Sequence, residues 1–293
     1  MAHNDHAIQD NTPKFETYTT AWCPGCGNFG IQRSLKDTLN EMGIDPHNVV
    51  IAAGIGQAAK MPQYVSSNRF CGLHGRSLAA ASGTKIANDK LTVIINTGDG
   101  DSFGEGGNHF LAAIRRNVNI THMAHDNQVY GLTKGQASPT ALQGYKTSIQ
   151  TDGSNNIPFN PVATALIMGA GFVARTFSGD QKQLKEIMQA AIEFDGYALI
   201  DIFQPCVTFN KVNTFAWYKE RVRPVGEDYD PTDFEQALKA ATQFSDEDGI
   251  PTGILYNVPK PTFKSQNRVM QQAPLLEQGA DREFMESQLK YYA

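Results

Sequence analysis

The chain of 293 residues is 41% apolar and 19% charged, and its formal charge is −5. This composition is typical of a globular protein with one large or two modest domains, and it excludes a disordered chain. Proteins that bind nucleic acids need clustered Lys and Arg to contact the phosphates, and this acidic chain has no basic run. We therefore expect no nucleic-acid partner. The first fifteen residues contain no signal-peptide pattern, and no apolar run approaches the ~20 residues of a membrane helix. We therefore expect a cytoplasmic protein that does not bind membranes.

Short β-rich runs alternate with helical patterns between about residues 28 and 203. Helices are expected at 28–42, 76–89, 104–117, 161–170 and 180–194, and strands at 49–56, 91–97, 118–127, 172–177 and 197–203. Pro161 suits the first turn of its helix, and Ser178 with Gln181 predicts a capping box for the helix at 180–194. The alternation predicts mostly parallel strands with right-handed crossovers, and so a doubly wound α/β fold.

The composition changes after residue 220. Six of the fourteen prolines lie between Pro224 and Pro274, with acidic clusters between them. We expect residues 1–220 to form the α/β domain. Residues 221–293 are expected to form an extended C-terminal tail that packs on that domain or on a partner subunit.

A glycine-rich loop, residues 98–107, follows the strand expected at 91–97. Glycines let the backbone approach an anion, and the start of a helix offers free N–H groups to it. Asp99 lies in this loop, and Asn127 ends the next expected strand. Because parallel strands share one carboxyl edge, we expect both side chains on one hard cation such as Mg²⁺ beside a phosphate. The simpler alternative is a structural turn capped by Asp99.

Longer motifs resemble those of one enzyme family. GDG followed by a distant Asn is similar to the motif of thiamine-diphosphate enzymes. The ordered run GLHGR, GDGDSFGEGGNHFLAAIRRNVNI, DNQVYGLTKGQ and SPT resembles the β subunit of 2-oxoacid:ferredoxin oxidoreductases, as do WCPGCG before it and PFNPVA after it. The resemblance covers about residues 18–215. It implies a sheet of the thiamine-diphosphate-binding type. The implied reaction is CoA-dependent oxidative decarboxylation of a 2-oxoacid to acyl-CoA and CO₂, or its reverse, with electrons passed to ferredoxin.

The resemblance also implies how the cofactor site is divided. Asp99, Asn127 and the backbone carbonyl of Val129 would hold Mg²⁺ on the diphosphate. The cofactor itself would be contacted by Ile55, Gly56, Gln57, Ala58, His74, Gly100, Asp101, Gly131 and Leu132. In this family the α subunit supplies the glutamate that activates the cofactor. We therefore expect half an active site, no certain catalytic residue in this chain, and a hetero-oligomer such as (αβ)₂.

The chain has four cysteines, Cys23, Cys26, Cys71 and Cys206, which are too few for a disulfide framework. Cys23 and Cys26 alone are typical of a redox dithiol. Four thiolates suit either Zn²⁺ or a [4Fe–4S] cluster, and spacing alone does not separate these. The resemblance implies the cluster. The family's third cysteine commonly follows GIG, where this chain has Gln57. We expect that this amide, a poor iron ligand, does not replace it and that Cys71 supplies the fourth thiolate.

Lys134 and Leu132 lie in the segment that the resemblance assigns to substrate binding. Relatives with GLTK tend to accept 2-oxoglutarate, and an ammonium at Lys134 can pair with its distal carboxylate. A merely solvated lysine is the alternative. Two other functions stay open from the residues: a non-oxidative thiamine-diphosphate decarboxylase or synthase, and a zinc-stabilised scaffold that binds a phosphate ligand.

Overall fold

The computed structural model describes residues 14–245, 247–279 and 281–292. Within them an eight-stranded sheet has the order β2-β1-β3-β4-β8-β7-β10-β9. Its neighbouring strands are parallel except β7 and β10, which are antiparallel. The strands are β1 (Val49–Ala53), β2 (Asn68–Cys71), β3 (Thr92–Gly98), β4 (Ile120–Asp126), β7 (Phe172–Phe177), β8 (Tyr197–Phe203), β9 (Val222–Pro224) and β10 (Ile250–Asn257). A separate hairpin pairs β5 (Val129–Tyr130) with β6 (Gln136–Ala137).

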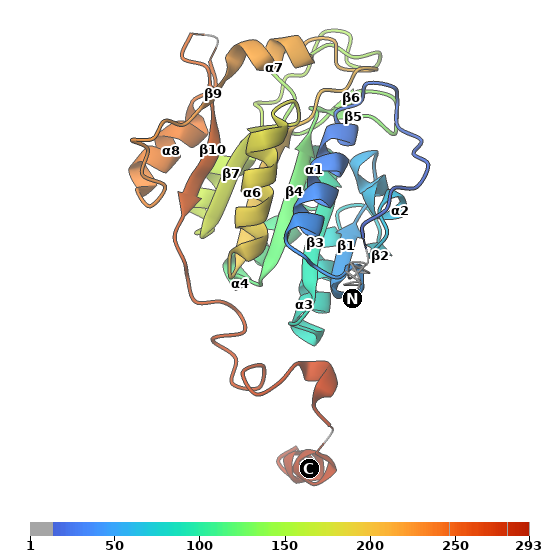
Figure 1. The fold of residues 1–293 in the computed structure, drawn as a ribbon, viewed down its shortest axis with the longest axis vertical. Helices are drawn as coiled ribbons and strands as arrows, with labels where there is room; N and C mark the ends of the chain where they lie inside the picture. Colours follow the sequence, from blue (N-terminus) through green and yellow to red (C-terminus); the bar gives the residue numbers. More distant parts are fainter. Residues whose placement is uncertain (1–13, 246, 280, 293) are drawn as a thin grey trace, which may run out of the picture.

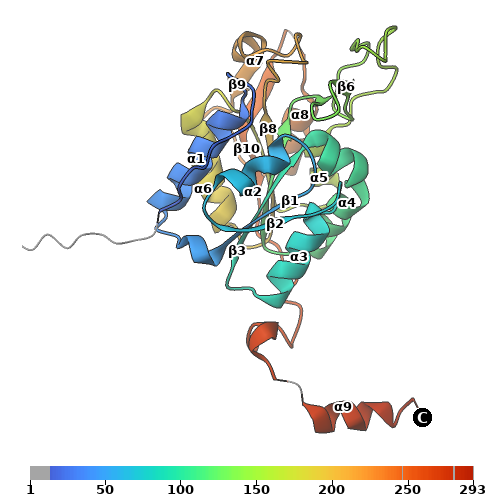
Figure 2. The ribbon, with the colours of Figure 1, turned by 90° about the vertical axis from the view of Figure 1, so that its right-hand side faces the viewer.

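Helices cover both faces of the sheet, which Figure 2 shows nearly edge-on. One face carries α1 (Asn28–Glu41) and α6 (Gln181–Glu193), and the other carries α3 (Ser77–Ala87), α4 (Gly107–Arg116), α5 (Pro161–Ile167) and α8 (Phe234–Thr242). A π-helical turn (Gly100–Glu105) joins β3 to α4. The remaining helical segments are short: Pro46–Asn48, Ala58–Lys60, α2 (Met61–Tyr64), α7 (Phe215–Arg221), Leu275–Glu277 and α9 (Arg282–Leu289). None of the helices in the described residues is long and apolar enough to cross a membrane.

The core forms two apolar layers, one on each side of the sheet. Along β8, Leu199 belongs to the cluster under α3, α4 and α5, whereas Ile200 belongs to the cluster under α1 and α6. This alternation follows from the two-residue period of a strand, and burial on both faces explains why β8 is apolar throughout. On α1, Ile31, Leu35 and Leu39 recur every fourth residue and are fully buried.

The doubly wound, mostly parallel α/β fold that the sequence predicts is confirmed, together with the ten helices and strands expected between residues 28 and 203. The capping prediction at α6 was wrong. The N-cap is Asp180, whose carboxylate accepts a hydrogen bond from Gln183 N at 3.0 Å. The Gln181 amide instead donates to the backbone carbonyl of Ser178. Asp180 is the N-cap because it lies directly before the helix, where its carboxylate can reach the N–H groups of the first turn.

The sequence patterns did not predict β9 and β10, which lie beyond residue 220 and extend the same sheet. Pro251 and Gly253 break the strand pattern of β10. Only residues 253–257 of β10 pair with β7. Pro251 lies outside this ladder, so its missing N–H removes no hydrogen bond between β10 and β7. Beyond β10 the chain runs past the base of the sheet, and α9 lies away from the body of the molecule (Figure 1).

Candidate functional site

The predicted site residues gather at the carboxyl edge of the sheet. Asp99 directly follows β3 and Asn127 directly follows β4, and these strands are parallel neighbours in which Gly98 pairs with His125. Both residues line one pocket with the loop after β1. We call it the acidic pocket. It is lined by Ile55, Gly56, Gln57, Ala58, His74, Gly98, Asp99, Gly100, Asp101, Asn127, Val129, Tyr130, Gly131, Leu132 and Thr133. The structure thus brings together every residue that the sequence analysis assigned to Mg²⁺ or to the cofactor.

Asp99 is almost completely buried, with 1% of its surface exposed. Its Oδ2 accepts hydrogen bonds from the hydroxyls of Ser138 and, at 2.6 Å, Thr140. Burial raises the pKa of Asp99 above its ordinary value, while these two hydrogen bonds oppose the rise. A carboxylate in this position is therefore stabilised by any cation that the pocket admits.

Thr140 links Asp99 to a second buried acid. Its hydroxyl lies 2.6 Å from Asp99 Oδ2 and 2.7 Å from Asp126 Oδ1. A hydroxyl has a single proton, so it can donate to only one of them, and the other carboxyl must supply the second proton. Burial, together with the charges of Asp201 and Asp99, raises the pKa of Asp126 well above its usual range. Burial thus disfavours the charged form of both acids, which share the one hydroxyl of Thr140.

The balance of buried charge at this edge also favours a cation. Asp99, Asp101, Asp126 and Asp201 are each at most 3% exposed. The buried Arg175 lies beside Asp201, with 3.8 Å between Nε and Oδ2, and it donates to backbone carbonyls near the end of α8. Asp126, Asp201 and Arg175 line a separate pocket, so the buried acids of the acidic pocket itself are Asp99 and Asp101. Asp101 faces His74, whereas Asp99 has no ion pair among the described residues. Buried charge needs a partner, so the acidic pocket fits a bound cation.

Asn127 and Val129 provide oxygens beside Asp99. Gln128 between them adopts φ +62°, which turns the chain sharply. In this turn Asn127 Oδ1 accepts a hydrogen bond from Val129 N at 3.0 Å, and its amide Nδ2 donates to Gln204 Oε1 at 3.1 Å. The second lone pair of Oδ1 stays available. A carboxylate, an amide oxygen and a backbone carbonyl form a donor set that fits Mg²⁺.

Asp101 fastens two loops of the acidic pocket to each other. Its Oδ1 accepts from Ile55 N at 3.0 Å and from Gly75 N at 2.8 Å, and His74 Nδ1 lies 2.8 Å from the same oxygen. The approach is so close that a Cβ on Gly54 would lie 2.2 Å from Asp101 Oδ2. Gly75 has φ +73°, and a Cβ there would meet the backbone of Glu105 at 2.4 Å. The GLHGR motif therefore needs a glycine at position 75, because of this backbone conformation and this close contact.

The loop after β5 differs from the rest of the site in being exposed. Leu132 lines the acidic pocket and is 45% exposed, whereas Lys134 is exposed and lies outside the lining. Lys134 adopts φ +79°, a left-handed conformation that is uncommon for lysine. Among the described residues, no hydrogen bond or ion pair holds the ammonium of Lys134 toward the pocket.

Three of the four cysteines line a second pocket, which we call the cysteine pocket. Cys23 and Cys26 reach it from the segment before α1, and Cys206 reaches it from the segment after β8. It shares Gln57, Asn127 and Gly131 with the acidic pocket, so the two pockets adjoin. Burial raises the pKa of the Cys26 thiol to about 11, and the neighbouring Cys206 and Cys23 add to the rise. This set fits three of the four ligands that the sequence analysis expected.

The fourth expected ligand, Cys71, is not brought to these three. It ends the edge strand β2, is exposed, and pairs in register with Ala53. The structure therefore does not place Cys71 among the residues that line the cysteine pocket. Within the described residues, no group of three or more His, Cys, Asp or Glu side chains is arranged to hold a single metal ion. The cysteines are thus not the compact tetrahedral set that structural zinc uses.

Comparison with known proteins identifies the architecture. A model of the C-terminal TPP-binding domain of thiamine pyrophosphate enzymes matches residues 47–202. A model of the C-terminal part of pyruvate ferredoxin oxidoreductase β subunits matches residues 206–272. A 2-oxoacid:ferredoxin oxidoreductase subunit beta from a Sulfolobus species is 45% identical over 246 residues, which cover 80% of this chain and 81% of the relative. The chain belongs to the β subunits of the 2-oxoacid:ferredoxin oxidoreductases.

Further relatives of this β subunit carry 2-oxoglutarate in their names. The 2-oxoglutarate oxidoreductase subunit KorB of Mycobacterium tuberculosis is 42% identical over 199 residues, which cover 68% of this chain and 53% of the relative. A solved structure of a 2-oxoglutarate:ferredoxin oxidoreductase from Magnetococcus marinus, with 2-oxoglutarate, coenzyme A and succinyl-CoA bound, superposes with a TM-score of 0.88. It shares 37% identity and covers 96% of this chain and 97% of its own. The β subunit is therefore part of an oxidoreductase that has at least one partner subunit.

Sequence reasoning missed three residues of the site in this β subunit. Ser138 and Thr140 hold Asp99, and Gln204 joins the two pockets, since its amide contacts Asn127 and, at 3.5 Å, Cys26 Sγ. The SPT motif was a signal for the two hydroxyls. Gln204 directly follows β8, the strand beside β4, and that neighbour relation would have placed it.

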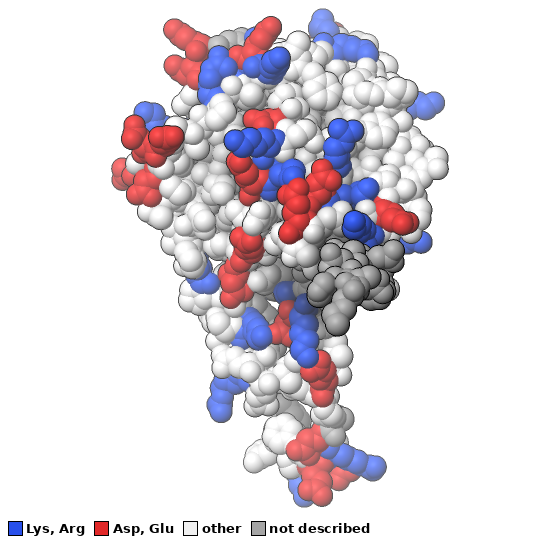
Figure 3. Space-filling view, viewed as in Figure 1, with Lys and Arg blue, Asp and Glu red and all other residues white. Residues whose placement is uncertain are grey.

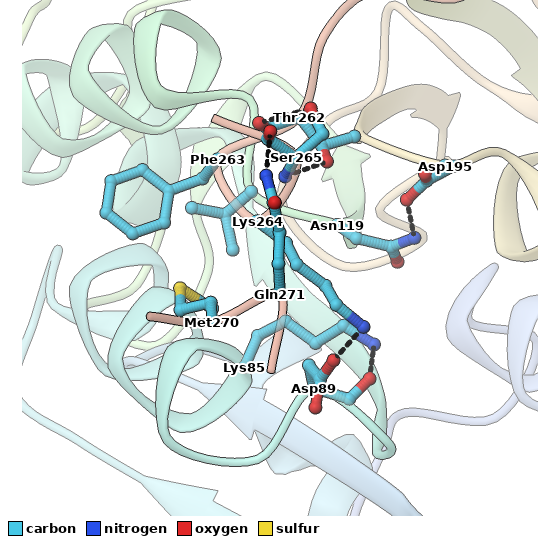
Figure 4. A pocket seen from close by; sticks show the side chains of 11 residues that line it. Lys85, Asp89, Asn119, Asp195, Thr262, Phe263, Lys264, Ser265, Met270 and Gln271 are labelled. Carbon is cyan, nitrogen blue, oxygen red and sulfur yellow. Dashed lines mark hydrogen bonds and ion pairs between the residues drawn. The ribbon is translucent and has the colours of Figure 1, made fainter. Parts of the chain in front are cut away.

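Another hollow lies at the opposite end of the strands, and Figure 4 shows it from close by. Here the C-terminal tail packs on the segments before β3, β4 and β8. Lys264 of the tail pairs with Asp89, and Lys85 donates to the carbonyls of Asp89 and Leu91 at 2.8 and 2.6 Å. These ammonium groups are already bonded within the chain. These contacts hold the tail on the domain, and the described lining leaves neither Lys85 nor Lys264 unpaired for a phosphate.

Proposed function

We propose that this β subunit, together with an α subunit, catalyses the CoA-dependent oxidative decarboxylation of 2-oxoglutarate to succinyl-CoA and CO₂, or the reverse reaction. Two electrons would leave one at a time through an iron–sulfur cluster to ferredoxin. The observation that carries the proposal is the acidic pocket, in which buried oxygen ligands adjoin a pocket lined by three cysteines. A cofactor site next to an electron-transfer site suits an oxidoreductase, whereas a non-oxidative thiamine enzyme has no need of the second.

Three residues of the acidic pocket are proposed to hold Mg²⁺ on the cofactor diphosphate: Asp99, Asn127 and the carbonyl of Val129. The buried acids favour a divalent cation there, and Mg²⁺ commonly joins one or two protein carboxylates to phosphate oxygens. Thiamine diphosphate, when bound, supplies the nucleophilic carbon and the electron sink that decarboxylation of a 2-oxoacid requires. Asp101 is proposed to have a structural role, because its hydrogen bonds keep the loops that carry Ile55 and His74 at a fixed spacing.

The choice of 2-oxoglutarate rests on two supports. Relatives named for 2-oxoglutarate match this chain in sequence and in structure. In addition, Lys134 lies two residues beyond Leu132, which lines the acidic pocket. A second carboxylate distinguishes 2-oxoglutarate from pyruvate, and an ammonium near the mouth of the pocket would favour it. We propose that the partner subunit confines Lys134 to that position.

An α subunit is proposed to cover the mouth of the acidic pocket. Ile55 and Leu132 line the pocket yet are 39% and 45% exposed, and Leu73 beside His74 is 76% exposed. Clustered exposed apolar side chains mark interaction surfaces. On the face drawn in Figure 3, charged residues gather over α6 and α8.

The C-terminal tail is proposed to contribute to the same assembly. Helix α9 buries none of its residues in this chain. Its apolar side chains Phe284, Met285 and Leu289 are each at least 59% exposed. Such a helix gains stability only when a partner covers its apolar side.

The test is to co-produce the chain with its α subunit without oxygen and to measure reduction of a low-potential dye. We expect reduction that requires 2-oxoglutarate, CoA and thiamine diphosphate together, with succinyl-CoA as product. A brown protein that dithionite bleaches would support the cluster. Decarboxylation without reduction of the dye would favour the non-oxidative alternative, and a colourless protein that binds phosphate without turnover would favour the scaffold.

A further inference from the structure

The cysteine pocket presents three thiols and one unpartnered amide oxygen. Cys23, Cys26 and Cys206 line it. Among the described residues of its lining, Gln57 is the one that has a buried side-chain oxygen, Oε1, without a hydrogen-bond partner. An unsatisfied buried oxygen costs free energy unless a ligand occupies its lone pairs. Gln57 lines both the cysteine pocket and the acidic pocket. Its Oε1 is therefore suited to contact a bound group where the two pockets adjoin.

The position of Gln57 is fixed by its surroundings. Its backbone carbonyl accepts a hydrogen bond from Trp22 Nε1 at 2.8 Å, which ties it to the residue directly before Cys23. The side-chain oxygens of two polar neighbours are already bonded, since Gln204 Oε1 accepts from Asn127 and Asn28 Oδ1 lies 2.8 Å from His125 Nδ1. Cys71 is outside the lining. The fourth corner of a cluster held by the three thiols would accordingly meet Gln57 and not a fourth thiol.

We propose that the cluster of this chain has three thiolate ligands, from Cys23, Cys26 and Cys206, and that its fourth iron faces the side-chain oxygen of Gln57 and is exchangeable. This inference rests on the proposed function, which supplies the cluster. A neutral amide oxygen is a harder and weaker ligand than thiolate for iron in a sulfide cluster. One iron is thus held less firmly than the other three.

The redox consequence is specific. Ferricyanide takes one electron from [4Fe–4S]²⁺, and the weakly held iron leaves as Fe²⁺, which produces [3Fe–4S]⁺. The charges balance. Removal of one electron raises the charge of the intact cluster from 2+ to 3+, which is the sum of the product cluster (1+) and the released Fe²⁺ (2+). A cluster with four thiolates resists this loss because every iron is held by the chain.

The experiment uses the αβ enzyme purified without oxygen, in the wild-type form and as Gln57→Cys, Gln57→Ala, Cys71→Ser and Cys206→Ser. Iron per β chain is measured relative to Cys206→Ser, which sets the background from other clusters. We expect about four irons in wild type and about three after oxidation, with a [3Fe–4S]⁺ electron paramagnetic resonance signal of about one spin per chain. Cys71→Ser should have the same iron content as wild type, before and after oxidation, and the same three-iron signal.

The two Gln57 variants test directly whether Gln57 faces the exchangeable iron. Gln57→Ala should hold about three irons as isolated, and Gln57→Cys should hold about four that survive oxidation without the three-iron signal. An oxidation-resistant wild-type cluster would overturn the inference, as would loss of iron in Cys71→Ser comparable to that in Cys206→Ser. Thiamine diphosphate binding is titrated on the same samples. Binding without a cluster overturns this inference alone, whereas absence of binding contradicts the proposed function.

Discussion

The acidic pocket and the cysteine pocket share Gln57, Asn127 and Gly131 but are built in different ways. The acidic pocket forms where two consecutive parallel strands, β3 and β4, end side by side, and its carboxylates are buried and hydrogen-bonded. The cysteine pocket joins the segment before α1 to the segment after β8, and one of its cysteines, Cys23, is exposed. The first region is thus preorganised by two neighbouring strands, whereas the second brings together distant parts of the chain.

The largest expected effect tests the acidic pocket. Asp99→Asn keeps the shape and an oxygen that accepts from Thr140, but removes the charge that faces the cation. Loss of a buried charge partner costs roughly 3–5 kcal/mol, on the order of 10²–10⁴-fold in affinity. Asp99→Ala should abolish retention of thiamine diphosphate outright. Calorimetric titration with thiamine diphosphate and Mg²⁺ measures both.

Asn127→Ala is the graded comparison for Asp99. It removes a neutral ligand and the hydrogen bond to Val129 N, so we expect a smaller loss of roughly 1–3 kcal/mol. An Asp99 variant that binds the cofactor as tightly as wild type would mean that this pocket does not hold the diphosphate.

The next effect concerns the exposed loop between the pockets and the solvent. Lys134→Ala in the αβ enzyme should raise KM for 2-oxoglutarate about 10- to 100-fold and spare pyruvate, because a charged hydrogen bond contributes roughly 1.5–3 kcal/mol. Lys134→Gly is the matched control, since glycine relieves the left-handed φ of +79° while also removing the ammonium. Steady-state kinetics with both substrates should give the same KM change in the two variants. Equal changes for pyruvate would exclude a role for Lys134 in substrate choice.

The acidic pocket was predictable from the sequence for a physical reason. Asp99 and Asn127 follow consecutive strands of one crossover unit, and such strands usually pair as neighbours, so the spacing alone placed them together. The hydroxyls of Ser138 and Thr140 were not predictable in this way. They reach Asp99 only because the β5–β6 hairpin folds back over the edge of the sheet, and a loop path has no periodic signal.

The cysteine pocket was predictable only in part. Cys206 meets Cys23 and Cys26 because β8 pairs with β4 in the middle of the sheet, and strand order is not encoded in local patterns. Counting thiols suggested that Cys71 completes a set of four. The structure places Cys71 on the edge strand β2 instead, since β2 pairs with the outer side of β1. The number of cysteines was a poorer guide than their place in the sheet.

A smaller effect is expected on the pH dependence of stability, from His122 beneath the acidic pocket. Burial lowers the pKa of His122 to about 3, and it contacts Ser102 Oγ and Tyr197 OH at 2.9 and 2.7 Å. Between about pH 6.5 and pH 3 the unfolded chain binds a proton that the folded chain does not, so stability falls as pH falls. His122→Gln should reduce this slope by up to about 1.4 kcal/mol per pH unit.

Urea unfolding at several pH values across this window measures the slope for His122→Gln. Burial also raises the pKa of Asp201 to about 7, which gives a slope of opposite sign, but this contribution is common to wild type and variant and cancels in their difference. The exposed His47 provides the control, since its ring is in water in the folded chain as well. A slope that His122→Gln leaves unchanged would show that the ring is protonated in the fold.

The smallest effect tests the start of α6, which supports α1 and thereby the segment that carries Cys23 and Cys26. Gln181 Oε1 accepts from Ser34 of α1 at 2.9 Å, so the first turn of α6 anchors α1. Asp180→Ala removes the cap on Gln183 N and should cost about 1 kcal/mol of unfolding free energy. Ser178→Ala should be neutral or slightly stabilising, because the Ser178 hydroxyl is buried without a partner. The free energies of urea unfolding of the two variants show whether Asp180 or Ser178 caps α6. If Ser178→Ala costs as much as Asp180→Ala, the capping box expected from the sequence is present after all, and the anchor of α1 begins two residues earlier.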